Sequence, residues 1–298
     1  MPAKRPIIVG LGEVLWDLLP AGRQLGGAPA NFAYHAQALG AEAWLVSAVG
    51  RDELGREALA RLRAAGLDVR HVARIATHPT GTVGVELNAA GQPRFTIHEN
   101  VAWDYLKLHE STLALAPRAD AVCFGSLGQR GVVARAAIRR FLAATRPDCL
   151  RVFDVNLRAP HYTREVVLDS LAVASVFKLN EDELPVVADW LGVPADETAV
   201  FARLWQAFPR QIIALTRGER GATLATRAER VDLPAVPPPV LADTVGAGDA
   251  FTAALVCGWL ARRPLRVIGE RAVRLASFVC SRPGAMPDLK DFVATACV

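Results

Sequence analysis

The segment Asp243-Thr-Val-Gly-Ala-Gly-Asp-Ala-Phe251 (DTVGAGDAF) places a turn of small residues and an acid directly before an apolar run, TAALVCGWLA. Gly246 and Gly248 can adopt positive φ and keep side chains away from a ligand. Successive N–H groups in such a turn, at the start of a helix, form an anion site. Asp249 would lie in the first helical turn, where the dipole favours its ionised form. This arrangement suits phosphoryl transfer, although the motif alone also describes an ordinary helix start.

Short apolar runs alternate with helical patterns through most of the chain. The runs PIIVGL, AWLVSAVG, AVCFGS, RVFDVN, SVFKLN and QIIALT predict buried strands. Helical patterns lie between them, at 29–40, 53–66, 132–146 and 181–192. Continuously apolar strands that alternate with helices indicate a parallel sheet covered on both faces. We therefore predict a three-layer α/β/α fold with a mostly parallel central sheet.

Two regions, EVLWDLLPAGRQL and TGTVGVELNAAGQPRFTIHEN, break this alternation. Both have the pattern of half-buried strands with turns, and the second carries NAAGQP, a hairpin signal. We predict a small β-flap, or lid, formed by about 14–25 and 80–104. The proline-rich PAVPPPVLADT is a stiff connection to the glycine turn, because the roughly 60 residues after it are too few for a separate domain. The whole chain, 1–298, is predicted to be a single domain.

The overall composition limits the classes of protein that need to be considered. A hydrophobic fraction of 52% and a charged fraction of 21% indicate a globular protein with a large core. The net charge is only +4, and the arginines of 132–146 fit a solvated helix face better than a nucleic-acid site. The five cysteines show no metal spacing, which indicates buried thiols in a reducing cytosol. Without a signal peptide or an apolar run of about 18 residues, we expect a soluble, cytoplasmic protein with no nucleic-acid or membrane partner.

Several motifs together resemble one protein family. DTVGAGDAF is similar to the signature of the ribokinase/fructokinase family of carbohydrate kinases. GGAPAN at 26–31 resembles a second family motif, and GE at 12–13, followed by Asp17, precedes it at the expected place. The resemblance extends from about residue 5 to about residue 290, with the motifs in the family's order. It implies a ribokinase-like fold and an ATP-dependent transfer of phosphate to a sugar.

For the reacting groups, the resemblance implies that Asp249 is the catalytic base that deprotonates the sugar hydroxyl. It also implies that Gly246, Ala247 and Gly248 form the anion hole for the transferred group, with both glycines contacting the nucleotide. The pattern Asp-x-Asn-x-Arg in FDVNLR at 153–158 is common among fructokinase-like members, and it follows a strand end, where ligands of open α/β sheets bind. Arg158 would then hold the phosphoryl group in transit, although a structural salt bridge is almost as good an explanation.

For the sugar, the resemblance implies binding by Asp17, Asn31 and the backbone at Gly27. Carboxylates and amides suit hydroxyl groups, because a buried polar group without a partner is costly. From the residues alone, Asp17 also fits a turn and Asn31 a helix start after Pro29.

For the nucleotide, KLNEDE at 178–183 is similar to the family's Asn-x-x-Glu motif. It implies that Asn180 contacts the nucleotide and that Glu183 holds Mg2+ through water, which suits a hard cation on nucleotide phosphates. LTRGERG resembles the nucleotide-contacting turn and is matched at Thr216, Gly218 and Gly221. The first segment also fits a helix start with acids, and the second a plain hairpin turn.

Near the C-terminus, ASFVCSRPGAMP resembles the segment that closes over the adenine of ATP. Together with Asp243 it implies a monovalent-cation site, so K+ is an additional expected cofactor.

The segment 12–41, together with ENVAWDYL, looks most like bacterial fructokinases. This implies D-fructose as the acceptor and fructose 6-phosphate as the product, and family lids that pair between subunits imply a homodimer. Trp16, Phe95 and Trp103 either stack on the sugar or belong to the core, and Trp103 is our candidate for substrate binding. Other acceptors are ribose, tagatose, a nucleoside and 2-keto-3-deoxygluconate; a flap cation, Arg94 or His98, would serve the carboxylate of the last.

Two other classes of function deserve comparison. IIVGLGEVLWDL offers Gly-x-Gly after a strand, but Leu15 stands where a dinucleotide-binding motif needs Gly or Ala, so a dehydrogenase is excluded. A non-catalytic sugar or nucleotide sensor on the same fold is the second. The intact GAG and Asp249 argue against it.

Overall fold

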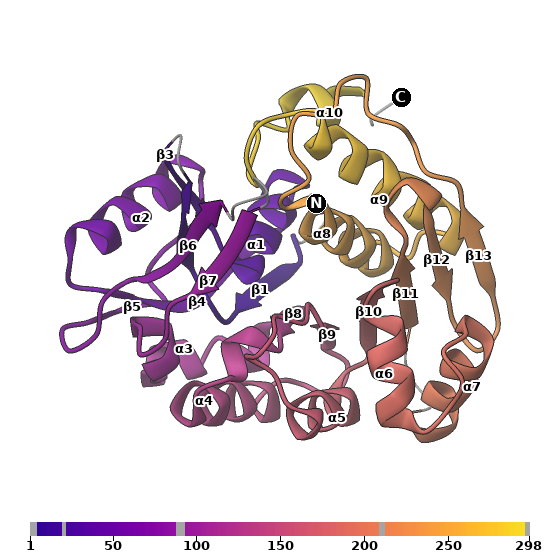
Figure 1. The fold of residues 1–298 in the computed structure, drawn as a ribbon, viewed down its shortest axis with the longest axis horizontal. Coiled ribbons are helices and arrows are strands. Elements are labelled where there is room, and N and C mark those ends of the chain that lie inside the picture. Colours follow the sequence, from indigo (N-terminus) through magenta and orange to yellow (C-terminus); the bar gives the residue numbers. More distant parts are fainter. Residues whose placement is uncertain (1–4, 20–21, 88–92, 209–211, 296–298) are drawn as a thin grey trace.

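The computed structural model describes residues 5–19, 22–87, 93–208 and 212–295, with the side chains of 85–87, 93–95 and 295 excepted (Figure 1). Its central sheet has the strand order β13-β12-β11-β10-β9-β8-β1-β4-β5. The strands are β1 (Ile7–Leu11), β4 (Glu42–Gly50), β5 (Val72–Ile75), β8 (Ala121–Gly125), β9 (Leu150–Asp154), β10 (Val176–Asn180), β11 (Ile212–Thr216), β12 (Ala222–Ala225) and β13 (Arg230–Leu233). All neighbours are parallel except the pairs that β12 makes with β11 and β13.

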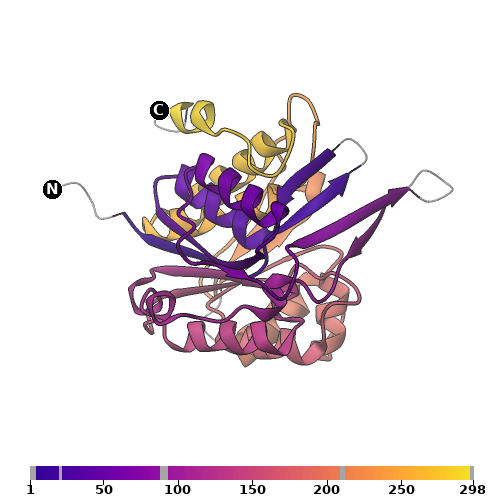
Figure 2. The ribbon, with the colours of Figure 1, turned by 90° about the vertical axis from the view of Figure 1, so that its left-hand side faces the viewer.

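Helices cover both faces of this sheet, as Figure 2 shows. One face carries α1 (Ala28–Ala38), α2 (Glu53–Ala64), α8 (Ala247–Leu260), α9 (Leu265–Cys280) and α10 (Lys290–Thr295). The other carries α4 (Val132–Ala143), α5 (Arg164–Val173), α6 (Leu184–Leu191) and α7 (Glu197–Ala207). Short helical turns lie at α3 (Glu110–Leu113), Ala102–Tyr105, Ala116–Arg118, Leu127–Gln129 and Gly218–Arg220. The predicted three-layer, mostly parallel fold is confirmed.

The apolar runs form buried strands because alternate side chains serve the two layers. On β1, Ile8 belongs to the core under α1 and α8, whereas Val9 and Leu11 belong to the core under α4 and α5. The six predicted strands and the four predicted helices are all present. In the described part of the chain, no helix has the length and apolarity needed to cross a membrane.

The two irregular regions contribute a second sheet, in the order β3-β2-β6-β7. It consists of β2 (Leu15–Leu19), β3 (Gly22–Gly26), β6 (Gly81–Leu87) and β7 (Pro93–Ile97). The parallel pair of β2 and β6 joins regions that are distant in sequence. The sheet projects from the main body (Figure 2). The predicted NAAGQP turn includes residues 88–92, which lie outside the described residues.

The strand order reverses at β1, which lies between β8 and β4. In open α/β sheets, ligands bind beyond the carboxyl ends of the strands at such a reversal. Gly12 and Glu13 follow β1 directly, and α1 packs against α8 beside it. The fold therefore directs attention to this end of the sheet.

Candidate active site

Asp249 and Asn31 meet at this point of the fold. Asp249 lies in the first turn of α8, and its Oδ2 accepts a hydrogen bond from Asn31 Nδ2 on α1 at 2.8 Å. Asn31 is only 3% exposed, and its Oδ1 has no partner within the described residues. The Nδ2 atom of Asn31 thus holds the Asp249 carboxylate in place, and its Oδ1 atom is left as a hydrogen-bond acceptor.

The surroundings of Asp249 suit a proton acceptor. Burial raises the pKa of Asp249 to about 7, with support from the negative charges of Asp154 and Glu13. The Asn31 hydrogen bond and the Lys178 ammonium oppose this shift. A general base works best when its pKa is close to the operating pH, so the carboxyl is matched to deprotonating an alcohol near neutrality.

The start of α8 requires glycine at position 246 and leaves little room for a side chain at position 248. Gly246 has a φ of 80°, and a Cβ there would lie 2.7 Å from the Ala285 carbonyl oxygen. A Cβ on Gly248 would lie 3.1 Å from Lys178 Nζ. The Ala247 N–H already donates to the Thr244 carbonyl at 3.3 Å, so this amide is used inside the turn. The free N–H groups expected at a helix start are those that follow it.

Asp17 and Arg158 lie on the lid side of the site. Asp17 is half-buried on β2, and its Oδ2 covers the Gly26 backbone, where a Cβ would come within 2.8 Å. Burial raises the pKa of Asp17, and the Arg158 guanidinium opposes this shift. Arg158 is exposed on the loop after β9 and borders a cavity of about 730 Å³ with lid residues 96–99. The Arg158 charge thus acts on Asp17, so both residues lie on the lid side of the candidate site.

Glu13 is a buried acid directly after β1. It is 2% exposed, and its Oε2 has no partner in the described part of the chain. Burial raises the pKa of Glu13, and the charges of Arg158 and Arg130 oppose this shift. A Cβ on Gly27, which has a φ of 109°, would lie 2.7 Å from the Glu13 carbonyl oxygen. Gly27 is therefore required for α1 to begin against this strand end.

Asn180 and Glu183 form a closed pair after β10. The Glu183 N–H donates to Asn180 Oδ1 at 2.9 Å, and the Asn180 N–H donates to Glu183 Oε2 at 2.8 Å. Glu183 Oε1 accepts the Leu157 N–H at 2.9 Å, so this carboxylate also ties down the loop after β9. Burial raises the pKa of Glu183, while Lys178 lowers it.

The carboxylate of Glu183 suits only an indirect contact with Mg2+. Across the described ranges, no three His, Cys, Asp or Glu side chains group as metal ligands. Mg2+ commonly keeps several waters and binds through phosphates with one or two carboxylates. Glu183, whose oxygens already accept backbone N–H groups, fits a contact through water rather than a direct one.

The turn from Thr216 to Gly221 joins β11 and β12, which pair antiparallel. Gly221 has a φ of 88°, and a Cβ there would lie 2.0 Å from the Leu233 carbonyl oxygen. Gly218, with a φ of 52°, is exposed. The hairpin geometry explains both glycines, and contact with a nucleotide remains a proposal.

Asp243 connects the loop before α8 to the segment after α9. Its Oδ1 accepts the Val245 N–H at 3.0 Å, and its Oδ2 accepts the Gly284 N–H at 3.2 Å. Because both oxygens face backbone donors, this geometry gives the expected K+ site no support.

Trp16 and Trp103 are both buried. Trp16 Nε1 donates to the Leu54 carbonyl at 3.0 Å, so this ring belongs to the core and does not line the sugar site. Trp103 lies under the Arg130 guanidinium, whose Cζ is 4.1 Å from the ring centre. A sugar could meet Trp103 only if Arg130 moved. The side chains of Phe95 and Arg94 lie outside the described residues.

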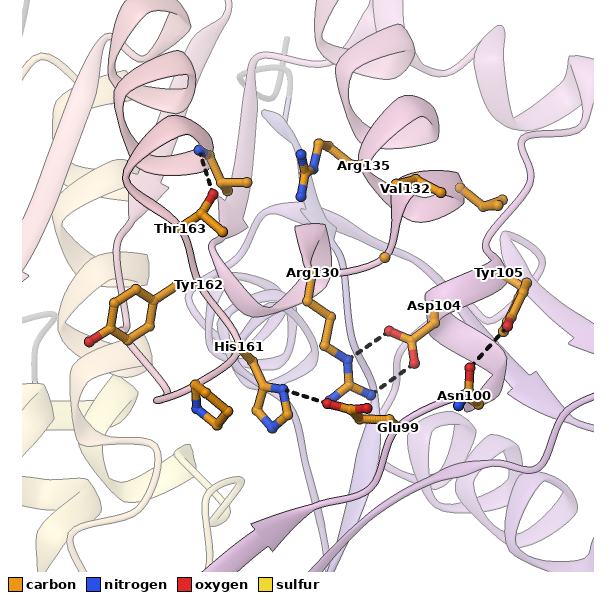
Figure 3. A pocket seen from close by; sticks show the side chains of 14 residues that line it. Glu99, Asn100, Asp104, Tyr105, Arg130, Val132, Arg135, His161, Tyr162 and Thr163 are labelled. Atoms are coloured by element: carbon orange, nitrogen blue, oxygen red, sulfur yellow. Dashed lines mark hydrogen bonds and ion pairs between the residues drawn. The ribbon is translucent and has the colours of Figure 1, made fainter.

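A pocket of about 380 Å³ lies where the lid joins the main body (Figure 3). Arg130 Nε and Nη2 each donate to Asp104 at 2.8 Å, and Nη2 also donates to the His98 carbonyl at 2.6 Å. His161 Nδ1 lies 3.4 Å from Glu99 Oε1 across the pocket. These contacts attach the lid segment after β7 to the loops after β8 and β9.

Comparison with known proteins accords with this arrangement. The model of the pfkB family of carbohydrate kinases matches residues 21–291. The chain belongs to this family. The predicted ribokinase-like relationship is therefore confirmed.

Individual pfkB-family relatives are similar over most of their length. A fructokinase of Klebsiella pneumoniae is 32% identical over 260 residues, which cover 83% of this chain and 82% of that protein. The solved structure of an uncharacterized sugar kinase, PH1459 from Pyrococcus horikoshii, in complex with ATP has a TM-score of 0.79 at 28% identity and covers 94% of each chain. A fructokinase from Xylella fastidiosa with bound ATP has a TM-score of 0.82 over 98% of this chain and 99% of that one; at 21% identity it shows the fold alone.

Lys178 lies beside the candidate site of this pfkB-family chain, and the sequence predictions did not include it. Its Nζ lies 3.1 Å from Asp154 Oδ1, and both side chains are buried. A sequence signal existed, because a lysine inside the apolar strand SVFKLN has to be buried with a partner. Glu13 likewise appeared only as part of the GE motif.

Proposed function

We propose that this pfkB-family chain is an ATP-dependent sugar kinase that phosphorylates the primary hydroxyl of D-fructose to give fructose 6-phosphate. The contact of Asn31 with Asp249 at the start of α8 is the observation that carries this proposal. It joins an acceptor-side amide to a carboxyl whose pKa is near 7, beside a helix N-terminus. The fructokinase relatives support fructose as the acceptor, and the PH1459 complex supports ATP as the donor.

In the proposed reaction, the acceptor hydroxyl oxygen attacks the γ-phosphorus of ATP and gives its proton to Asp249. The bond from the γ-phosphorus to the β–γ bridging oxygen breaks, and ADP leaves. N–H groups at the start of α8 stabilise the charge on the transferred group. Bound Mg2+ would neutralise phosphate charge, held through water by Glu183.

Acceptor binding is assigned to Asp17, Asn31 and the Gly27 backbone. Thr216, Gly218 and Asn180 are assigned to the nucleotide. The lid, at 14–25 and 80–104, would close over the sugar and exclude water. Its open sheet edges favour the proposed homodimer.

One observation favours a second acceptor class. Arg158 lies near Asp17, where it could pair with a carboxylate on 2-keto-3-deoxygluconate. This acceptor is the alternative to fructose.

A coupled ADP-release assay tests the proposal with ATP and Mg2+ across fructose, ribose, tagatose, 2-keto-3-deoxygluconate and adenosine. We expect fructose to give the highest kcat/KM. Turnover with another acceptor far ahead would replace fructose, and no acceptor-dependent ADP release would overturn the proposed kinase activity for this panel.

A further inference from the structure

Lys178 lies on β10, beneath the turn that begins α8. Its side chain is 9% exposed, and its Nζ pairs with Asp154 Oδ1 at 3.1 Å. Asp154 Oδ2 in turn lies 3.3 Å from Thr252 Oγ1 of α8, whose hydroxyl is also 2.9 Å from the Gly248 carbonyl. The ammonium is thus held between the end of β9 and the first turns of α8.

The ammonium has donors to spare. A lysine ammonium carries three N–H donors, and Asp154 is the one hydrogen-bond partner of the Lys178 ammonium among the described residues. Gly248 stands directly against it, because a Cβ at that position would lie 3.1 Å from Nζ. The missing side chain leaves Nζ next to the backbone that would hold a phosphoryl group.

The charges around Lys178 also indicate a task beyond stability. Burial lowers the pKa of Lys178, but the carboxylates of Asp154, Glu183 and Asp249 together raise it above its ordinary value. The group therefore stays a cation inside the protein. Buried ion pairs seldom stabilise a fold more than apolar residues of similar size would, so stability alone is a weak reason to place one here.

We propose that Lys178 is a further catalytic residue, whose Nζ donates a hydrogen bond to a non-bridging oxygen of the γ-phosphoryl group during transfer. This inference rests on the proposed kinase function. Lys178 exchanges no proton or bond in the step. The acceptor proton goes to Asp249, the phosphoryl group goes to the acceptor oxygen, and Lys178 remains an ammonium that stabilises the charge in transit.

The test compares Lys178→Met with Lys107→Met, which makes the same change at an exposed lysine. Steady-state kinetics are measured on full-length protein with ATP, Mg2+ and the best acceptor of the panel. We expect Lys178→Met to lower kcat by about 100-fold or more, as for the loss of one transition-state donor, with KM for the acceptor nearly unchanged. Lys107→Met is expected to match the unmodified protein.

A binding measurement separates this role from support of the fold. Calorimetry with ADP alone and with ADP plus aluminium fluoride, a mimic of the transferred group, should show that Lys178→Met keeps its affinity for ADP. Its affinity for the fluoride complex should fall at least tenfold. Equal losses for both ligands, or kcat within fivefold of the unmodified protein, would overturn the proposal.

Two precautions keep the outcome decisive. If Lys178→Met does not fold, the double variant Lys178→Met/Asp154→Asn removes both charges, a change that buried pairs often tolerate. It must show the same selective loss of affinity for the fluoride complex. If the unmodified protein turns over none of the panel acceptors, the kinase proposal fails on its own, and the fluoride-complex affinity decides the role of Lys178.

Discussion

Two buried ion pairs border the candidate site, and they are built differently. In Lys178–Asp154 and in Arg130–Asp104, every side chain is less than a tenth exposed. Arg130 donates to Asp104 through both Nε and Nη2, and its Cζ lies over the Trp103 ring, so the planar guanidinium is held in one geometry. Lys178 makes one bond and keeps two donors. The comparison indicates that the Arg130–Asp104 pair has a structural role where the lid joins the main body. The Lys178–Asp154 pair has the proposed catalytic role at the start of α8.

The largest effect is expected for Asp249→Asn, which tests the chemical side of the comparison. The variant keeps the size of the side chain but cannot accept the proton, so kcat should fall by about a thousandfold or more. Binding of ATP and sugar and the melting temperature should change little. Kinetics and calorimetry check this, with the exposed Asp182→Asn as control. Activity within tenfold of the unmodified protein would refute the assignment of the base.

The next largest effect is expected for Arg130→Met, which tests the structural role of the Arg130–Asp104 pair. It leaves Asp104 buried and unpaired, so the free energy of unfolding should fall by about 3–5 kcal/mol. Chemical denaturation measures this loss. The double variant Arg130→Met/Asp104→Asn should recover part of the loss, because no buried charge is left unpaired. A single variant as stable as the unmodified protein would show that this pair does not anchor the lid.

The pH dependence sharpens the role of Lys178 further. The base must be deprotonated to act, so kcat/KM should rise with pH and reach half its plateau near pH 7. Asp154 and Glu13 raise the pKa of Asp249, while Lys178 and the Asn31 hydrogen bond lower it. Lys178→Met should therefore move the rise to higher pH. A profile unchanged in this variant would mean that the ammonium does not act on Asp249.

The smallest effect is expected for Arg139→Met, which breaks a pair with Asp169 whose side chains are about half exposed. Solvent screens this pair, so the unfolding free energy should change by less than about 1 kcal/mol. Denaturation under the conditions used for Arg130→Met gives the comparison. A loss as large as that of Arg130→Met would mean that burial does not distinguish the pairs.

The three layers of the fold could be predicted from the sequence, because the strands are continuously apolar and the apolar residues of the helices recur with helical periodicity. The helices α5 and α7 are among the elements missing from the sequence predictions, although each begins with a capping residue. Thr163 Oγ1 accepts the Val166 N–H, and Asp196 Oδ1 accepts the Ala199 N–H. Such capping residues are helix-start signals, so both helices could have been predicted from the sequence.

The candidate site was predictable as motifs but not as contacts. Asn31 and Asp249 belong to two separate family motifs in the sequence. Only the packing of α1 on α8 shows that Asn31 Nδ2 lies 2.8 Å from Asp249 Oδ2. The burial of Trp103 under Arg130 was equally out of reach, because it depends on a loop and a lid meeting in space. Lys178 was readable as a buried charge, but its place against Gly248 was not.

The contact between α1 and α8 also has a consequence for synthesis of the chain. Asn31 leaves the ribosome 218 residues before Asp249. If the ribosome adds about 5–20 residues per second, roughly 10–40 s pass between the synthesis of α1 and that of α8. The strands β1 and β4, which are made before or shortly after α1, also pack against it, so only the part of α1 that contacts α8 has to stay uncovered for that time. The contact between Asn31 and Asp249 therefore forms only after more than four fifths of the chain has been made.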